Sequence, residues 1–330
     1  MKAIVQDVYG SPDVLRLDDV DKPVAGDGEV LMRVHAAGVD AGVWHLTAGL
    51  PYLVRLMGLG FRRPKHRVRG MDLAGVVEAV GAGVTRFNPG DEVFGACDPS
   101  GRRGGSFAEF ACAPDGRLAP KPANLTFEQA AAVPVSACTA LQAVRNVQEV
   151  RPGQKVLVIG AGGGVGTWAV QIAKAFGAEV TGACSTAKVD LVRSLGVGDV
   201  VDTPHDDVAD GSRHFDLIND TAGRRPVRHL RRALAAKGTL VIVGGEGGGR
   251  LLGGFDRQMI RAPLLSLFTS QTMKSLMAKE SSEDLEALRE LIEAGKITPA
   301  VDRTYPLAET AAAVRYLHEG RACGKVVITV

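Results

Sequence analysis

Residues that could hold the phosphates of a nucleotide follow one apolar segment of the chain. The segment from Lys155 to Ile159 leads directly into the glycine-rich residues 160–166, and a run with helical spacing of apolar residues follows. Because glycine has no β-carbon, the backbone of such a turn can approach a pyrophosphate, whose charge is met by free N–H groups and by the positive end of the helix dipole. This order of strand, glycine turn and helix predicts a dinucleotide site, with a tight structural turn as the alternative.

The next predicted strand ends in residues 182–188, where the choice between the two nicotinamide cofactors is made. Enzymes that use NAD usually place an acid there to hold the ribose 2′-hydroxyl. The sequence GACSTAK has no acid; Ser185 can donate a hydrogen bond to a 2′-phosphate and Lys188 can supply a positive charge. This pattern favours NADPH over NADH. The alternative is that Ser185 is a helix N-cap and Lys188 a solvated residue in the first turn.

Alternating helix and strand signals from about residue 126 onwards must position these groups. The predicted helices are residues 128–132, 140–146, 165–177, 187–196 and 227–236. The predicted strands are residues 155–160, 179–183, 199–202, 215–220 and 239–245. Strands that alternate with helices of this length indicate parallel βαβ units, so the fold class is α/β with a doubly wound Rossmann sheet.

The two ends of the chain differ from this central part in the length and spacing of their apolar segments. Up to about residue 125 the apolar runs are short and interrupted by Gly, Pro and Asp, which is typical of a β-rich domain. The tail has two predicted helices, residues 283–294 and 307–318, and closes with the apolar strand KVVITV. A terminal strand needs a sheet to join, and we expect the N-terminal β-rich domain to provide it.

Several motifs together identify a family resemblance that covers essentially the whole chain. They are MKAIV with YGSPDVL, GMDLAGVVEAVGAGV, FNPGDEVFG, GGSFAEF, AAAVPVSACTALQAV and GAGGGVGTWAVQIAKAFGA. The chain resembles the zinc-free quinone oxidoreductase branch of the medium-chain dehydrogenase/reductase superfamily. The resemblance implies a GroES-like catalytic domain formed by residues 1–125 and 276–330, a Rossmann NADPH-binding domain of residues 126–275, and a homodimer.

The same resemblance implies a set of cofactor contacts. Thr139 and Asp40 are expected near the nicotinamide, and Ser185 and Lys188 at the 2′-phosphate. The full set of expected cofactor-binding residues is Thr139, Gly163, Gly164, Val165, Ser185, Lys188, Val243, Gly244, Leu267, Phe268, Thr269 and Lys325.

The positions that hold catalytic zinc in related alcohol dehydrogenases are occupied here by Asp40, Met71 and Val135. Methionine is a poor zinc ligand and valine is none, so we expect no metal. The cysteine-rich loop of the structural zinc is also absent between Gly95 and Ala111. His45 falls where a proton-relay histidine stands in the zinc enzymes, but its expected role here is structural, because Gly42 replaces the connecting hydroxyl residue.

Two residues are candidates for catalysis. Zinc-free relatives commonly have Asn-Pro-x-Asp where this chain has residues 40–43, DAGV. Asp40 could still accept a hydrogen bond from the nicotinamide carboxamide; the alternative is a solvated or capping aspartate. Tyr52 lies near a position from which some relatives contact NADPH or protonate an enoyl substrate, and its alternative role is packing.

Without a Lewis acid, the reduction of a conjugated acceptor is easier to support than the reduction of a simple carbonyl. Hydride transfer to a quinone or an α,β-unsaturated carbonyl leaves a delocalised charge that needs only hydrogen-bond donors. The sequence therefore predicts an NADPH-dependent quinone or enone oxidoreductase with a small electrophilic substrate. The alternatives are a pathway-specific enoyl or alkenal reductase and a non-catalytic NADPH-binding sensor.

The amino-acid composition argues against several classes of binding partner. The chain has 39 basic and 37 acidic side chains, which argues against nucleic acid or an anionic membrane as the main partner. The basic clusters at residues 62–69 and 224–232 are expected to be solvated faces. Five cysteines without a C-x-x-C pair argue against a disulfide framework, and no signal peptide or membrane span is evident, so a cytoplasmic location is expected.

Overall fold

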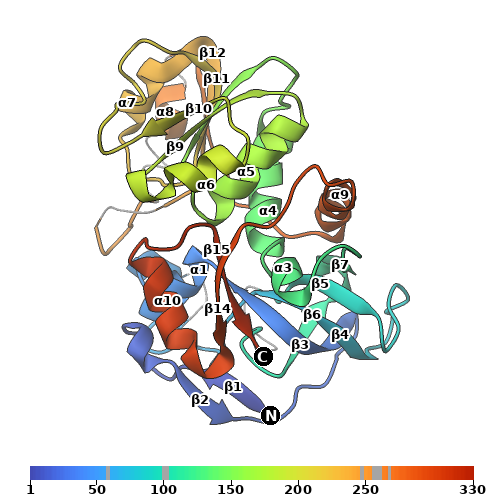
Figure 1. Ribbon diagram of the computed structural model, residues 1–330. Coiled ribbons are helices and arrows are strands. Elements are labelled where there is room, and N and C mark those ends of the chain that lie inside the picture. Colours follow the sequence, from blue (N-terminus) through green and yellow to red (C-terminus); the bar gives the residue numbers. More distant parts are fainter. Residues whose placement is uncertain (57–59, 99–103, 246–248, 255–261, 267–268) are drawn as a thin grey trace. The chain divides into compact units, whose positions relative to one another are not determined.

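The computed structural model describes residues 1–56, 60–98, 104–245, 249–254, 262–266 and 269–330 (Figure 1). The chain forms two compact units. The first unit contains Met1–Cys138, Lys279–Gly295 and Pro299–Val330, and the second contains Thr139–Ala278 and Lys296–Thr298. The chain first passes from one unit to the other inside helix α4 (Pro134–Leu141), and it passes between them again after Ala278, Gly295 and Thr298. The predicted domain bounds, with changes at residues 125 and 275, stay a prediction.

The second unit is built on a six-stranded parallel sheet, with the order β10-β9-β8-β11-β12-β13. Its strands are β8 (Lys155–Ile159), β9 (Glu179–Cys184), β10 (Asp199–Asp202), β11 (Phe215–Asp220), β12 (Leu234–Ile242) and β13 (Thr272–Ser275). The chain moves outward from β8 to β10 and then returns to β11 on the other side of β8. This reversal is the switch point of a doubly wound sheet, so the predicted fold class is confirmed.

Helical segments of this unit connect the strands. They are the π-helical segment η4 (Gln142–Val147), α5 (Gly164–Ala175), the 3-10 turn η5 (Thr186–Lys188), α6 (Val189–Ser194), α7 (Val227–Leu230), the 3-10 turn η6 (Arg231–Ala233) and α8 (Ala262–Ser266). The prediction of one helix over residues 227–236 was wrong at its end. The helical segment stops at Ala233 and β12 begins at Leu234, because Leu234 pairs with Phe215 of β11.

The first unit contains a sheet with the order β14-β15-β3-β4-β5-β7, in which β6 also pairs with β3, and a separate ribbon of β1 and β2. Its strands are β1 (Lys2–Val5), β2 (Arg16–Asp19), β3 (Glu29–Val39), β4 (Asp72–Val80), β5 (Glu92–Ala96), β6 (Phe110–Pro114), β7 (Leu118–Pro120), β14 (Val301–Pro306) and β15 (Lys325–Thr329). The closing strand β15 lies antiparallel to β3, so the terminal strand joins the N-terminal sheet as predicted.

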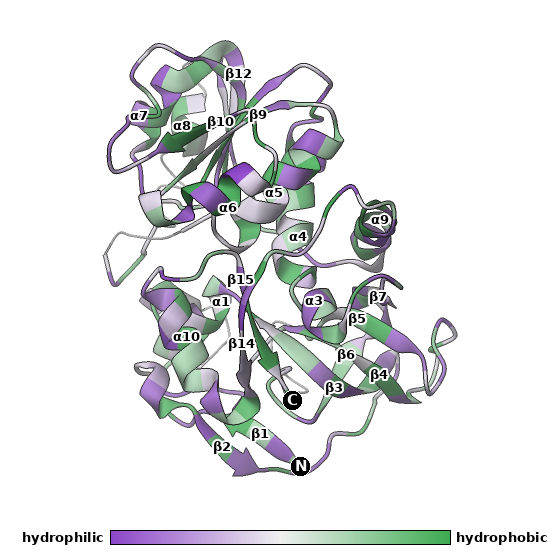
Figure 2. Cartoon of the chain, in the orientation of Figure 1, coloured by the Kyte–Doolittle hydropathy of each residue, from purple (hydrophilic) through white to green (hydrophobic). Residues whose placement is uncertain are grey.

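Short helices cover this sheet. They are η1 (Pro12–Val14), α1 (Ala41–Ala48), α2 (Tyr52–Val54), η3 (Asp115–Arg117), α3 (Phe127–Ala131), α9 (Ser282–Glu293), η8 (Leu307–Glu309) and α10 (Thr310–His318). Helix α3 begins at a capping box in which Thr126 and Gln129 satisfy each other's backbone N–H groups. Figure 2 shows hydrophilic and hydrophobic residues mixed along α10, and Ala313 and Val314 on this helix are buried in the core of the unit. This is the pattern of a helix with one face on a sheet.

No helix among the described residues is long and apolar enough to cross a bilayer.

Candidate nicotinamide site and buried charge cluster

The glycine turn lies at the carboxyl edge of the parallel sheet, between β8 and α5. Gly163 is the N-cap of α5, so Gly164 and Val165 form the first turn, where backbone N–H groups have no partner within the helix. A β-carbon on Gly166 would come 2.0 Å from the carbonyl oxygen of Gly160, so only glycine allows this close packing. Gly163, Gly164 and Val165, all predicted to bind the cofactor, thus stand at the positive end of a twelve-residue helix.

The predicted 2′-phosphate residues lie beside this turn. Ser185 is exposed and caps the 3-10 turn η5, where its carbonyl accepts a hydrogen bond from the N–H of Lys188 at 2.8 Å. The stem of Lys188 lies over Gly162, because a β-carbon on Gly162 would come 2.6 Å from the Lys188 Cβ. The structure therefore brings Lys188 to the glycine turn, 22 residues after Gly166 in the chain.

One acid at this edge was missed by the sequence analysis. Asp202 ends β10 and pairs in register with Cys184, the last residue of β9. Its Oδ1 accepts a hydrogen bond from the Thr186 hydroxyl at 3.0 Å. Parallel strands end at the same edge of a sheet, so the last residue of each predicted strand is expected near the predicted cofactor site. This rule could have identified Asp202 from the sequence.

Val243 and Gly244 follow β12 at the same edge. Their N–H groups both donate to the carbonyl of Asp220, at 3.0 and 3.2 Å, which ties the end of β12 to the end of β11. A β-carbon on Gly244 would come 2.3 Å from the carbonyl oxygen of Thr221. These two predicted residues are therefore placed by backbone contacts that leave no room for a side chain at residue 244.

The remaining predicted cofactor residues have different settings. Thr139 is buried in α4. Thr269 is half-buried and its hydroxyl donates to the carbonyl of Gln271 at 3.1 Å. Lys325 lies in the first unit, and Leu267 and Phe268 lie outside the described residues.

A groove of about 750 Å³ also belongs to the second unit, but it lies at the opposite edge of the sheet. Its lining includes Lys155, Glu179 and Asp199, which are the first residues of β8, β9 and β10. Ligands of open α/β sheets bind at the carboxyl ends of the strands, so the groove is distinct from the predicted cofactor site.

Asp40 stands where β3 ends and α1 begins. Its Oδ1 accepts a hydrogen bond from the N–H of Val43 at 3.3 Å, so it is the N-cap of α1. Its Oδ2 is buried and has no hydrogen-bond partner. The pKa of Asp40 is raised to about 6, mainly by burial and then by the charge of Asp72, while the charge of Lys325 and the backbone N–H groups of Gly42 and Val43 oppose the rise.

Lys325 and Asp72 form a buried ion pair near Asp40. The Nζ of Lys325 lies 2.9 Å from Oδ2 of Asp72, and the two side chains are 1% and 0% exposed. The ammonium also donates to the Ser136 hydroxyl at 3.0 Å, and Oδ1 of Asp72 accepts from the N–H of Val135 at 2.7 Å. Lys325 was predicted to contact the cofactor. In the structure its ammonium group is bound to Asp72 and Ser136.

Comparison with known proteins shows which family these features belong to. The alcohol dehydrogenase GroES-like domain model matches residues 26–123, and the zinc-binding dehydrogenase model matches residues 195–328. The mitochondrial NAD(P)H oxidoreductase RTN4IP1 of Bos taurus is 32% identical over 100% of this chain and 89% of its own length. The chain belongs to the quinone oxidoreductase branch of the medium-chain dehydrogenase/reductase superfamily.

Two other members of the superfamily are similar over nearly the whole chain. A 2-methylene-furan-3-one reductase of Solanum lycopersicum is 31% identical over 99% of this chain and 79% of its own. The solved structure of the quinone oxidoreductase from Coxiella burnetii has a TM-score of 0.84 and 28% identity, covering 100% of this chain and 99% of that one. This medium-chain reductase is therefore an oxidoreductase that uses a nicotinamide cofactor and acts on a small molecule.

Tyr52 and His45 have settings that separate their predicted roles. Tyr52 is 40% exposed at the start of α2, and the guanidinium of Arg55 lies 4.8 Å from its ring centroid. Nδ1 of His45 lies 2.8 Å from the carbonyl oxygen of Leu50, a contact that favours a structural role for this histidine. Tyr52 therefore keeps an accessible side chain, while His45 links two parts of the local backbone.

Within the described ranges, no group of three or more His, Cys, Asp or Glu side chains could hold a metal ion. At the positions that the zinc relatives use for ligands, Met71 and Val135 offer a thioether and an alkyl group. The donor types at these positions do not fit a catalytic zinc.

Proposed function

We propose that this medium-chain reductase uses NADPH to reduce quinones or α,β-unsaturated carbonyl compounds, and that it does so without a metal ion. The observation that carries the cofactor choice is the place of Lys188, whose stem lies over Gly162 of the glycine turn. No acid stands within residues 182–188, and Asp202 at the same edge accepts a hydrogen bond from the Thr186 hydroxyl. The names of two similar proteins, quinone oxidoreductase and 2-methylene-furan-3-one reductase, support the substrate class.

The residues at the carboxyl edge of the second unit's sheet fit a dinucleotide. Added β-carbons at Gly162, Gly166 and Gly244 would each come within 2.6 Å of another atom, so these positions leave bare backbone at the edge. The first turn of α5 offers N–H groups to a pyrophosphate. In this proposal the cofactor is held by Thr139, Gly163, Gly164, Val165, Ser185, Lys188, Val243, Gly244 and Thr269.

When bound, NADPH supplies the hydride from its nicotinamide C4 to the conjugated acceptor. Asp40 presents one buried carboxylate oxygen without a partner, which suits it to accept a hydrogen bond from the carboxamide NH₂. Tyr52, whose side chain is partly exposed, is the proposed proton donor that completes the reduction, in competition with solvent. In this proposal the protein's contribution is to bind, orient and protonate, and the reaction needs no Lewis acid.

The experiment is a titration of the purified protein with NADPH and, separately, with NADH, followed by the fluorescence of the bound cofactor. A 1,4-benzoquinone and a conjugated enone are then added to the same cuvette. Tight binding of NADPH with acceptor-dependent loss of fluorescence supports the proposal. Binding without oxidation by any acceptor would support the non-catalytic sensor instead, and no binding of either cofactor would overturn the proposal.

A charge-reversal variant sharpens the cofactor choice. We expect Lys188→Glu to weaken NADPH binding by about 10- to 100-fold, because a charge-assisted bond is replaced by repulsion, and to change NADH binding little. The matched control is Lys237→Glu, which reverses the charge of an exposed lysine on β12 of the same unit. Equal losses for NADPH and NADH in Lys188→Glu would contradict the assignment of Lys188 to the 2′-phosphate.

Three further properties belong to this proposal. The protein is a homodimer, its Rossmann domain spans residues 126–275, and it acts in the cytoplasm without a nucleic-acid or membrane partner. Light scattering of the eluting protein measures the mass against 34.6 kDa for one chain. Expression of residues 126–275 alone tests the bounds by NADPH binding, and cell fractionation tests the location.

A further inference from the structure

Four residues on one face of the first unit's sheet bring two acids and one base together. Val326 of β15 pairs with Val39 of β3, and one further step of this register places Lys325 opposite Asp40. Ala74 of β4 pairs with Ala36, and the same register places Asp72 opposite Gly38. Opposite residues of antiparallel strands, and residues two apart on one strand, share a face. Asp40, Asp72 and Lys325 therefore lie on the same face.

Gly38 makes room for this cluster. A β-carbon at this position would come 2.6 Å from Oδ2 of Asp72 and 2.5 Å from the carbonyl oxygen of Ala131, which ends α3. The carboxylate of Asp72 thus occupies the space above a missing side chain. The sheet, α3 and the start of α4 enclose the ion pair.

The carboxylate oxygens of Asp72 and the ammonium of Lys325 all have hydrogen-bond partners, whereas one carboxylate oxygen of Asp40 has none. Both oxygens of Asp72 are used, by Lys325 and by the N–H of Val135, and Lys325 also binds Ser136. Oδ2 of Asp40 is buried and unpartnered. A buried polar atom without a hydrogen-bond partner is costly unless a ligand supplies that partner. Asp72 and Lys325 have their partners within the protein, so Oδ2 of Asp40 is the acceptor that is left for a ligand.

We propose that Asp72 and Lys325 are positioning residues, which act on ligand binding by setting the electrostatic environment of Asp40. This inference rests on the proposed function, in which Asp40 accepts a hydrogen bond from the cofactor. In this role Lys325 acts through Asp40 and makes no contact with the cofactor itself. The pair is buried as a neutral unit, so its effect on Asp40 comes from how its two opposite charges are arranged.

The charged groups around Asp40 determine the sign of the effect. Burial raises the pKa of Asp40 most, the carboxylate of Asp72 on β4 raises it next, and the ammonium of Lys325 on β15 lowers it. Glu280, next to α9 and paired with Arg117, also interacts with Asp40, which contributes to raising the pKa of Glu280. Removal of Lys325 should therefore make Asp40 harder to ionise, and removal of the Asp72 charge should make it easier.

The test measures the titration of Asp40 directly, by ¹³C NMR of aspartate carboxyl groups, with the resonance assigned from Asp40→Asn. The variants are Lys325→Met, Asp72→Asn and the double variant. Asparagine keeps an acceptor for the N–H of Val135, so Asp72→Asn alters the charge while the anchor of α4 is retained. The matched control is Lys22→Met with Glu78→Gln, an exposed ion pair whose acid also stands on β4.

We expect the Asp40 midpoint to rise by about 1 pH unit in Lys325→Met and to fall in Asp72→Asn. In the double variant the two opposite effects are both removed, so the midpoint should lie between those of the two single variants. The pH at which NADPH affinity changes should follow the Asp40 midpoint in each variant. The control variant should match the wild type in both measurements.

The outcomes separate the inference from the proposed function. Where a single variant does not fold, the double variant, which leaves no lone buried charge, is compared with the wild type. Midpoints of Asp40 that match the wild type in every folded variant overturn the inference, whatever the enzyme does with NADPH. If the Asp40 midpoints shift but the pH dependence of NADPH affinity does not change, the electrostatic role of Asp72 and Lys325 is supported. The same result would overturn the proposed contact between Asp40 and the cofactor.

Discussion

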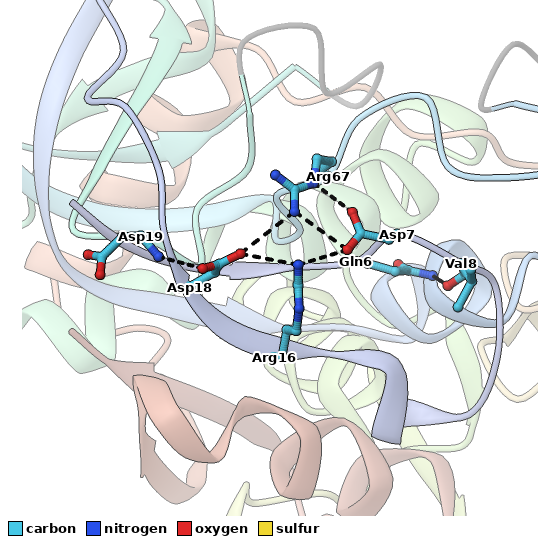
Figure 3. Close-up of polar contacts among 7 residues, drawn as sticks. All are labelled: Gln6, Asp7, Val8, Arg16, Asp18, Asp19 and Arg67. Atoms are coloured by element: carbon cyan, nitrogen blue, oxygen red, sulfur yellow. Dashed lines mark hydrogen bonds and ion pairs between the residues drawn. The ribbon is translucent and has the colours of Figure 1, made fainter.

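Two ion-pair groups in the first unit use the same chemistry in opposite surroundings. Asp7, Arg16, Asp18 and Arg67 form a chain of contacts between 2.7 and 3.7 Å, drawn in Figure 3, with side chains 41–50% exposed. Lys325 and Asp72 meet at 2.9 Å and are almost completely buried. The distance between two charged groups therefore does not show how much their contact contributes to stability, because exposure to solvent determines the energy of each charge.

Water and salt screen the exposed group, and its long side chains lose freedom when they pair, so such contacts contribute little net stability. In the buried pair the two charges have given up their hydration, and each depends on the other. A buried pair is therefore not a strong source of stability as a whole, but it is very sensitive to the loss of one partner.

The largest expected effect is the loss of one buried partner. Lys325→Met should lower the free energy of unfolding by about 3–5 kcal/mol, because it leaves the Asp72 carboxylate buried without its counter-ion. Denaturation by urea, read by circular dichroism, measures the change. The double variant with Asp72→Asn should recover most of the loss, and a double variant as unstable as the single one would contradict this explanation.

Crowding of the same pair should give the next largest effect. Gly38→Ala places a β-carbon 2.6 Å from Oδ2 of Asp72, which should cost about 1–3 kcal/mol of unfolding free energy through overpacking. Gly116→Ala is the matched control, since a β-carbon there has no neighbour within 4 Å. Equal stability of the two variants in urea would show that the space beside Asp72 is not filled as described.

Asp40, with one buried oxygen that lacks a partner, provides a pH test of intermediate size. Its pKa is raised to about 6 from an ordinary value of 3.8, so the folded state binds the proton more tightly. The resulting contribution to stability is complete below about pH 4 and is lost as the pH rises through 6. Asp40→Asn should therefore be more stable than the wild type at pH 7, by about 1–2 kcal/mol, and equal to it at pH 4.

This result is measured by thermal unfolding at the two pH values, together with NADPH affinity. The proposed function expects the stabilised variant to bind NADPH more weakly, because a neutral amide is a weaker acceptor than a carboxylate. A variant that is less stable than the wild type at pH 7 would contradict the burial of an unpartnered carboxylate at this position.

The smallest effect is expected on the surface. Arg67→Ala removes the hydrogen bond that lowers the pKa of Asp7, yet it should move the Tm by less than about 2 °C. Added salt should reduce even this difference. The comparison between the two regions fails if Arg67→Ala destabilises the protein as much as Lys325→Met does.

The second unit was largely predictable from the sequence because its signals are local. The glycine turn, the helix after it and the apolar strands are each written in a short stretch of residues, and their order implies the doubly wound sheet. Ser185 and Lys188 follow the strand next to the turn, so the same topology brings them to one edge. Asp202 was missed because its place at that edge depends on the pairing of β10 with β9.

The first unit shows what local signals could not decide. Asp72 and Lys325 are 253 residues apart, and the meeting of their side chains requires β4, β3 and β15 to pair in one register. The sequence suggested Lys325 as a cofactor contact and Asp40 as an acceptor for the nicotinamide. In the structure Lys325 is bound to Asp72 and Ser136, and Asp40 keeps one oxygen without a partner, while the cofactor roles of both residues stay predictions.

The sequence by itself therefore determined the kinds of element, their order and the phosphate-binding turn. These features depend on the spacing of residues within about 20 positions of one another and on glycine, which has no side chain. Only the tertiary structure decided which charges are buried and which partner each one has. The reason is physical: the energy of a charge depends on water and on neighbours from distant parts of the chain, and strand pairing settles both.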